Sequence, residues 1–154
     1  TLGGTLDPAK LTGTLGAFNS TLRITGNDLE LVLVSPFTTW QTNNSPGSTF
    51  NGDHDNDGVA NGIEYFLGGT SNTTGQTTLP AGQNNIGTLS ITWTKAPGHL
   101  GTYGTDFVIE SSDTLTGVWT TELLGVNVTA NGNNFTYTFP ASTRRFARLK
   151  VMGP

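Results

Sequence analysis

A twelve-residue acidic segment holds the side chains of this sequence that are best suited to chemistry. It runs from Asp53 to Glu64 and places carboxylates at its first, third, fifth and twelfth positions. Calcium is a hard cation that takes about six to eight oxygen ligands, which alternating carboxylates on a tightly curved loop supply. Gly58, at the sixth position, permits the sharp turn that carries a chain around an ion. The spacing therefore predicts a calcium site.

The predicted ligands combine side chains with one backbone carbonyl. Asn61 would bind directly or through water, and Glu64 would close the site in bidentate fashion from the start of a helix. The full predicted set is Asp53, Asp55, Asp57, the carbonyl of Val59, Asn61 and Glu64. A solvated acidic turn is the plainer alternative, because Asp, Asn and Gly are good turn residues. We favour the metal, because three closely spaced aspartates repel one another unless a cation lies among them.

Two short helices are expected around this loop. Val59 to Leu67 has apolar residues at helical spacing, and Gly68 is suited to end that helix in the left-handed conformation. Ser35 can cap an earlier helix that starts at Pro36, whereas residues 41–48 are expected to form a loop. Because residues 43–52 are not expected to be helical, the calcium loop lacks the entering helix of a full EF-hand. Such a half-motif favours a structural ion over a sensor.

Short strands are expected on both sides of this region, which gives a mainly β fold. Residues 1–34 alternate apolar and polar residues around a Gly-Asn turn, but they have too few large apolar residues for a core of their own. Residues 35–70 form the calcium junction and residues 71–86 a linker. Residues 87–154 contain several alternating runs, typical of a small β-sandwich. We expect residues 1–34 to add as strands to a neighbouring sheet, which predicts self-association.

Composition excludes several classes of protein. The net charge is −4, which argues against nucleic acid as a partner, because phosphate binding requires a basic surface. The absence of cysteine excludes disulfides, thiolate zinc sites and a cysteine nucleophile. No apolar run is long enough to span a membrane, and Leu29 to Val34 has only the length of a strand. The sequence begins without Met, which suggests a processed product or a fragment.

The calcium loop and its flanks also resemble a known kind of protein. The residues that carry this likeness are Phe50, the Asp-x-Asp-x-Asp-Gly loop, Asn61, Glu64-Tyr65 and Leu67-Gly68-Gly69. Together they are similar to a loop-then-helix segment near the C-terminus of large secreted bacterial surface proteins of the autotransporter-associated β-strand repeat type. That segment is similar to dockerin and thrombospondin type 3 calcium loops. The stretch from Val108 to Leu115, followed by Trp119, resembles the tail of those proteins more weakly. The resemblance implies a secreted, extracellular or cell-surface location.

No constellation of residues predicts an enzyme. His54 lies in the acidic loop and His99 in a Gly-rich turn, and no catalytic serine motif or phosphate loop is present. Among the other carboxylates, Glu110 is expected on the exposed face of a strand. The Arg and Lys residues between Arg144 and Lys150 are expected to protect an edge strand rather than to form a docking patch.

Aromatic residues leave a second function open. Trp40, Trp93, Trp119, Tyr103 and Tyr137 could stack on sugar rings. We expect Trp93 and Tyr137 in the core and Tyr103 as the best candidate for exposure. The sequence thus predicts a non-catalytic, calcium-stabilised extracellular structural or adhesive module that could self-assemble into surface fibres. A carbohydrate-binding module with a glycan partner is the alternative.

Overall fold

The computed structural model describes residues 12–15, 18–70, 79–141 and 144–153. Within them the chain is mainly β, as predicted, with three sheets and two helices. The strands are β1 (Thr12–Leu15), β2 (Phe18–Thr25), β3 (Asp28–Val34), β4 (Gly82–Asn85), β5 (Thr88–Thr94), β6 (Phe107–Ser112), β7 (Thr120–Thr121), β8 (Val128–Asn131), β9 (Asn134–Thr138) and β10 (Phe146–Val151). The helices are α1 (Pro36–Asn44) and α2 (Asn61–Leu67), and both lie between β3 and β4 in the chain.

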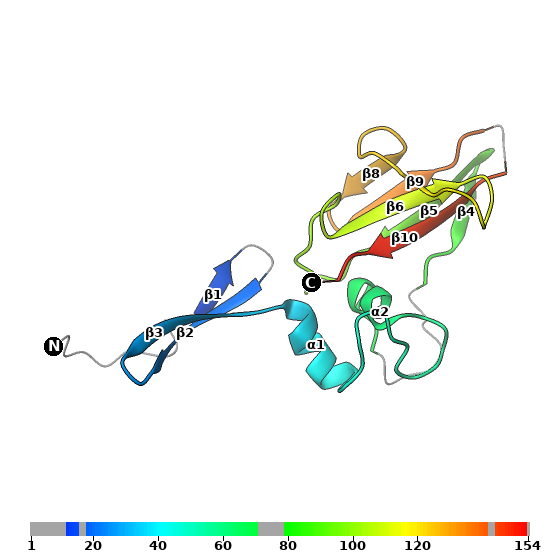
Figure 1. Cartoon of the computed structure of the whole chain (residues 1–154). Coiled ribbons are helices and arrows are strands. Elements are labelled where there is room, and N and C mark those ends of the chain that lie inside the picture. The colour runs from blue at the N-terminus through cyan, green and yellow to red at the C-terminus, as the bar shows by residue number, and fades with distance from the viewer. Residues whose placement is uncertain (1–11, 16–17, 71–78, 142–143, 154) are drawn as a thin grey trace.

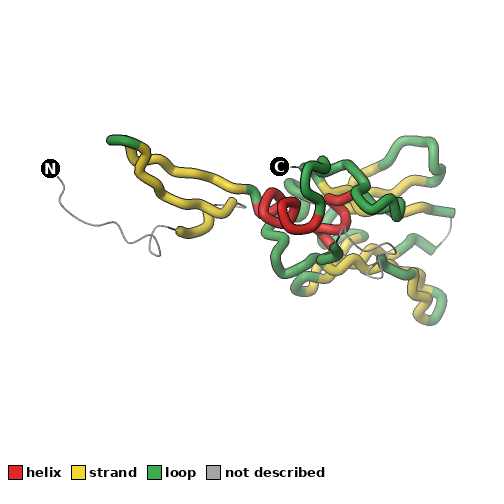
Figure 2. Tube along the Cα trace, turned by 90° about the horizontal axis from the view of Figure 1, so that it is seen from below, coloured by secondary structure: helices red, strands yellow, loops and turns green. Residues whose placement is uncertain are grey.

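Strands β1, β2 and β3 form an antiparallel sheet that projects from the rest of the molecule, as Figures 1 and 2 show from two directions. We call this sheet the arm. The hairpin of β2 and β3 was predicted, and its turn contains Gly26 with a φ of +63°, a value that glycine adopts at little cost. Residues 1–11 of the predicted N-terminal strand segment lie outside the described residues.

Helix α1 follows the arm and is longer than predicted. Ser35 caps it as expected, because its side chain accepts a hydrogen bond from the Phe37 N–H at 3.2 Å. The prediction of a loop from residue 41 is wrong up to Asn44, where side chains hydrogen-bond carbonyls one turn back; Asn44 Nδ2, for example, donates to Trp40 O at 2.8 Å. Residues 45–52 are not helical, so no helix runs directly into the acidic loop.

Helix α2 directly follows the loop, and its buried residues connect the loop to the hydrophobic core. It begins at Asn61, two residues later than predicted, and ends at Gly68, whose φ of +79° confirms the predicted left-handed cap. Phe66 and Leu67 are buried on its inner face, as the apolar spacing indicated. The loop is therefore joined to the hydrophobic core by a helix of less than two full turns.

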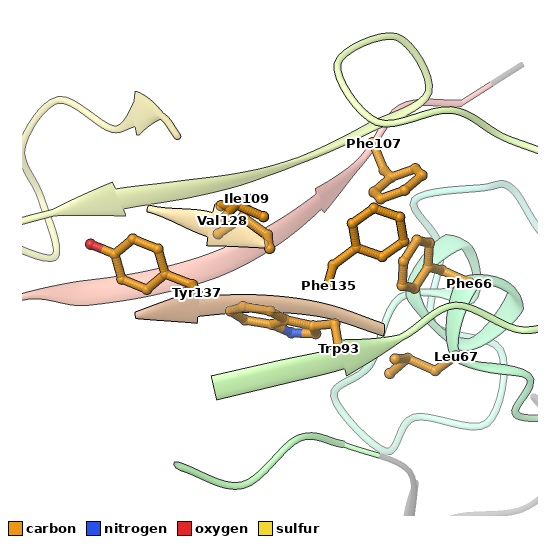
Figure 3. Packing of buried hydrophobic residues seen from close by; sticks show 8 residues of the cluster. All are labelled: Phe66, Leu67, Trp93, Phe107, Ile109, Val128, Phe135 and Tyr137. Carbon is orange, nitrogen blue, oxygen red and sulfur yellow. The ribbon is translucent and has the colours of Figure 1, made fainter. Parts of the chain in front are cut away.

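Two sheets of the C-terminal part enclose the core. Their strand orders are β10-β6-β7 and β4-β5-β9-β8, and all the pairings are antiparallel. Figure 3 shows side chains of both sheets meeting those of α2. The buried cluster is Phe66, Leu67, Trp93, Phe107, Ile109, Val128, Phe135 and Tyr137. This arrangement is the small sandwich expected from the alternating runs.

Two details of the sandwich differ from the sequence-based expectation. Strand β4 lies within residues 71–86, the predicted linker, and it pairs with β5 from Gly82 to Asn85. Residues 71–78 of that segment are outside the described part. Glu110 lies on the outer face of β6 but is only 5% exposed, because Arg148 and Lys150 of the edge strand β10 cover it with ion pairs at 2.7 and 3.1 Å.

None of the described helices is long and apolar enough to cross a membrane.

Candidate metal centre

Three aspartates of the acidic loop converge in space. One carboxylate oxygen from each of Asp53, Asp55 and Asp57 lies within 4.8 Å of the other two. The three side chains can meet because the backbone turns back between them, which brings the N–H groups of Asp57 and Gly58 to the carboxylate of Asp53. Carboxylates held this close repel one another strongly in the absence of positive charge.

The loop's own backbone holds these carboxylates in place. Asp53 accepts from the N–H groups of Asp57 at 3.2 Å and Gly58 at 2.9 Å. Asp57 in turn accepts from the Val59 N–H at 2.8 Å. Gly58 has a φ of +90°, in the left-handed region where glycine is favoured, and a side chain there would strain the turn. The glycine predicted at the sixth position therefore has the conformational role expected of it.

Glu64 approaches the same region from the first turn of α2. Its residue is 1% exposed, and its Oε2 atom has no hydrogen-bond partner among the described residues. Burial, reinforced by the charges of Asp55, Asp57 and Asp53, raises the pKa of Glu64 to about 7. Its carboxylate is not part of the group whose oxygens lie within 4.8 Å of one another. The helix thus positions a buried fourth acid beside three others.

Asn61, at the ninth loop position, is fully buried where α2 begins. Its Nδ2 donates to Ser48 Oγ at 2.8 Å and to Thr49 O at 2.7 Å, while its Oδ1 has no partner among the described residues. Its backbone N–H donates to Gly52 O at 2.8 Å. Asn61 therefore fastens the segment before the loop to the helix after it and keeps one oxygen free.

The segment before the loop was missed as part of the site. Residues 43–52 were expected only to be non-helical, yet residues 48–52 close the loop against α2 through Asn61 and through the Gly62 N–H, which donates to Phe50 O at 2.9 Å. Phe50 also packs on α2, where a β-carbon at Gly62 would come within 2.3 Å of its ring. The sequence pointed to this segment only through Phe50, which is part of the resemblance described above.

An aromatic cluster supports the site from the side of α1. Phe37 contacts Phe50 and Tyr65 with ring centroids 4.8 and 5.6 Å apart, and Trp40 lies 5.8 Å from Tyr65. Trp40 Nε1 also donates to Gly69 O at 3.2 Å, just after α2 ends. The two helices and the residues between them therefore form one packed unit around the loop.

The donor set fits a hard cation. It contains carboxylate and amide oxygens, and three of the oxygens that have no hydrogen-bond partner among the described residues belong to predicted ligands: Asp55 Oδ2, Asn61 Oδ1 and Glu64 Oε2. Buried polar atoms without partners cost about 1–3 kcal/mol each, and more when charged, unless something satisfies them. Oxygen ligands of this kind suit calcium, whereas zinc prefers nitrogen and sulfur.

The aromatic residues considered for sugar binding have other contacts. Trp93 and Tyr137 are buried in the core, as expected. Tyr103 was expected to be exposed, but it is half-buried, its ring lies 5.5 Å from that of Phe107, and its hydroxyl donates to Glu122 O at 2.7 Å. Trp119 lies under the Arg148 guanidinium at 4.1 Å. Packing and hydrogen bonding account for these positions.

Comparisons of the chain with protein families, curated proteins and solved structures give no match.

Proposed function

We propose that this chain is a non-catalytic, calcium-stabilised structural module that acts outside the cell and associates with further copies of itself. The observation that supports the calcium most directly is the buried, unpartnered oxygen of Glu64 beside three converging aspartates. A divalent cation among these oxygens would remove their mutual repulsion and satisfy the buried atoms.

Such an ion would have a structural rather than a signalling role. The loop leads into α2, and Phe66 and Leu67 anchor α2 in the core of the sandwich. A sensor requires two helices whose angle changes when the ion binds. Here α1 and α2 are already packed through Phe37, Trp40 and Tyr65, and Ala60 stands at the eighth position, where paired loops have a branched apolar residue. The ion would fix the junction between the arm and the sandwich.

Carboxylates outside the loop support the non-catalytic part of the proposal. Glu110 is paired with Arg148 and Lys150. Glu122 accepts hydrogen bonds from Ser111 and from Asn127, the latter at 2.8 Å. Both acids thus have partners that keep the outer strands and loops of the sandwich together.

An extracellular location is consistent with both the chemistry and the resemblance. Extracellular modules bind calcium with a Kd of roughly 10⁻⁴ to 10⁻³ M, and a single loop is sufficient for an affinity in this range. The scarcity of charged residues, 12% of the chain, and the likeness to secreted bacterial surface proteins support the same assignment. Self-association through the strands of residues 1–34 would suit a subunit of a surface fibre.

Calcium titration by calorimetry, after treatment with a chelator, tests the proposal. We expect one site, lost in Asp53→Ala and retained in His54→Ala, because His54 is exposed in the same loop and is not a predicted ligand. At a hundredfold excess of calcium over its Kd, the free energy of unfolding should rise by about 2.7 kcal/mol. An unchanged melting temperature with calcium and with chelator would reject the structural role.

A further inference from the structure

One face of the arm consists of large apolar side chains. Residues that are opposite each other in an antiparallel pair lie on the same face of the sheet. The pairings Leu15 with Phe18, Leu22 with Leu31 and Ile24 with Leu29 therefore place these residues together. With Leu33, which is opposite Ser20, they make up the arm face: Leu15, Phe18, Leu22, Ile24, Leu29, Leu31 and Leu33.

The opposite face of the same sheet is mostly polar. It carries Thr21, Thr25 and Asp28, and an ion pair between Arg23 and Glu30 at 2.7 Å. A sheet that is polar on one face and apolar on the other normally covers its apolar face with another layer of structure. Figures 1 and 2 show instead that the arm projects away from the sandwich.

The arm face is exposed over a large area. Six of its seven side chains, all except Leu22, are 39–62% exposed. Together they leave roughly 500 Å² of surface in each copy, if a fully exposed large residue presents about 150 Å². This area lies in the upper part of the range for the largest apolar patch on a monomer, about 300–600 Å², and such patches often have a binding function. Two such faces in contact would bury on the order of 1,000 Å², the lower limit of a specific interface.

We propose that the arm face binds the arm face of a second copy of this chain, so that the two sheets stack face to face. This deepens the self-association proposed above, but it assigns the contact to side chains on one face rather than to the backbone edge of a strand. Stacked sheets pack about 10 Å apart, and their side chains interdigitate.

A second copy suits this surface better than an unrelated partner. The arm face carries no charged side chain, so it offers no group that would select a partner of complementary charge. A second copy presents a face of the same extent and the same apolar side chains, so the two faces offer each other equal apolar areas. Arg23, Glu30 and Asp28 point away from the contact, so stacking brings no like charges together.

Sedimentation of the full chain over a wide range of concentrations tests the proposal with two matched variants. Leu31→Lys places a charge at the centre of the arm face, and Thr21→Lys places the same charge on the opposite face. Both positions are exposed, so both variants should fold. We expect Leu31→Lys to weaken dimerisation roughly a hundredfold or more, because one side chain is lost from the contact in each copy. Thr21→Lys should dimerise as the unmodified chain does.

Single cysteines distinguish stacking from strand addition. The chain has no cysteine, so Leu31→Cys and Val32→Cys each introduce one thiol, on opposite faces of β3. A thiol cross-linker of about 10 Å spans stacked sheets. Stacking predicts cross-linked dimers through position 31 alone. Cross-linking through both positions, or dimers that tolerate Leu31→Lys, would overturn stacking and leave self-association intact. A chain that stays monomeric at all concentrations would overturn both stacking and self-association. It would leave the calcium site untouched, because calorimetry tests that site independently.

Discussion

At the residue scale, burial and the charges of neighbouring aspartates both act on Glu64. It is 1% exposed and lies beside three aspartates, so without a cation its negative charge opposes folding. With calcium bound, the same charge would close the metal site. One substitution should therefore have opposite effects in the two conditions.

We predict that Glu64→Gln stabilises the chain in chelator by about 2 kcal/mol, because it removes a buried anion from the acidic group and nearly preserves its shape. In saturating calcium the variant should be less stable than the unmodified chain, because it loses a ligand. Thermal unfolding in both buffers measures this, with Asp28→Asn as a control that removes one charge from the exposed start of β3 in the arm. Destabilisation in both buffers would contradict the predicted role of Glu64.

His99 gives a second prediction at this scale. It is 5% exposed among the rings of Tyr65, Phe66 and Phe107, and its Nδ1 accepts from the Gly101 N–H at 3.2 Å. Burial, with a further contribution from the charge of Lys95 that outweighs Asp106, lowers the pKa of His99 to about 4. The folded protein therefore keeps this imidazole neutral in mildly acidic solution, where the unfolded chain is protonated.

Above about pH 6.5 His99 should therefore cause no loss of stability. As the pH drops from 6.5 towards 4, its protonation in the unfolded chain should lower the free energy of unfolding. The loss should total about 2–3 kcal/mol. Denaturant unfolding at a series of pH values, in saturating calcium, measures it. His99→Gln should flatten this part of the profile. If the two profiles run parallel between pH 4 and 6.5, the histidine is not the group responsible.

At the scale of elements, the close approach of Phe50 to α2 determines how the loop is closed. A β-carbon at Gly62 would lie 2.3 Å from the Phe50 ring, so Gly62→Ala must displace the ring or the helix. We expect a loss of about 1–3 kcal/mol, as is usual for an overpacked contact, together with weaker calcium binding. Thermal unfolding and calorimetry measure the two effects.

Gly98→Ala is the matched control for this substitution. A β-carbon at Gly98 meets nothing within 4 Å, and the residue does not have the positive φ that favours glycine. Its stability and calcium affinity should therefore remain close to those of the unmodified chain. Equal effects of the two alanines would show that the contact with Phe50 has no special role.

At the scale of the whole molecule, the arm and the sandwich differ in what stabilises them. All eight residues of the buried cluster come from α2 and the strands of the sandwich, and none comes from the arm. Removal of residues 1–34 should thus leave a folded chain with one calcium site but abolish self-association. Circular dichroism, calorimetry and sedimentation of residues 35–154 check these outcomes. Dimers or fibres formed without the arm would contradict the role given to it.

Local patterns in the sequence were sufficient for several features. Alternation in residues 22–34, with a glycine able to adopt positive φ, predicted the hairpin of β2 and β3. The spacing of Phe66 and Leu67 predicted the buried side of α2, and the alternating runs after residue 87 predicted the sandwich. The spacing of Asp53, Asp55 and Asp57 predicted a convergence that the structure contains. Each of these features depends on neighbours a few residues apart, which periodicity reveals.

Only the tertiary structure decided the features that depend on distant residues. The support of the site by Ser48 and Phe50 follows from their contacts with Asn61 and Gly62 of α2. The burial of Glu110 follows from its pairing with Arg148 of β10, which lies thirty-eight residues further along the chain. The exposure of the arm face also required the structure, because alternation in sequence shows that a strand has an apolar face but not what covers it.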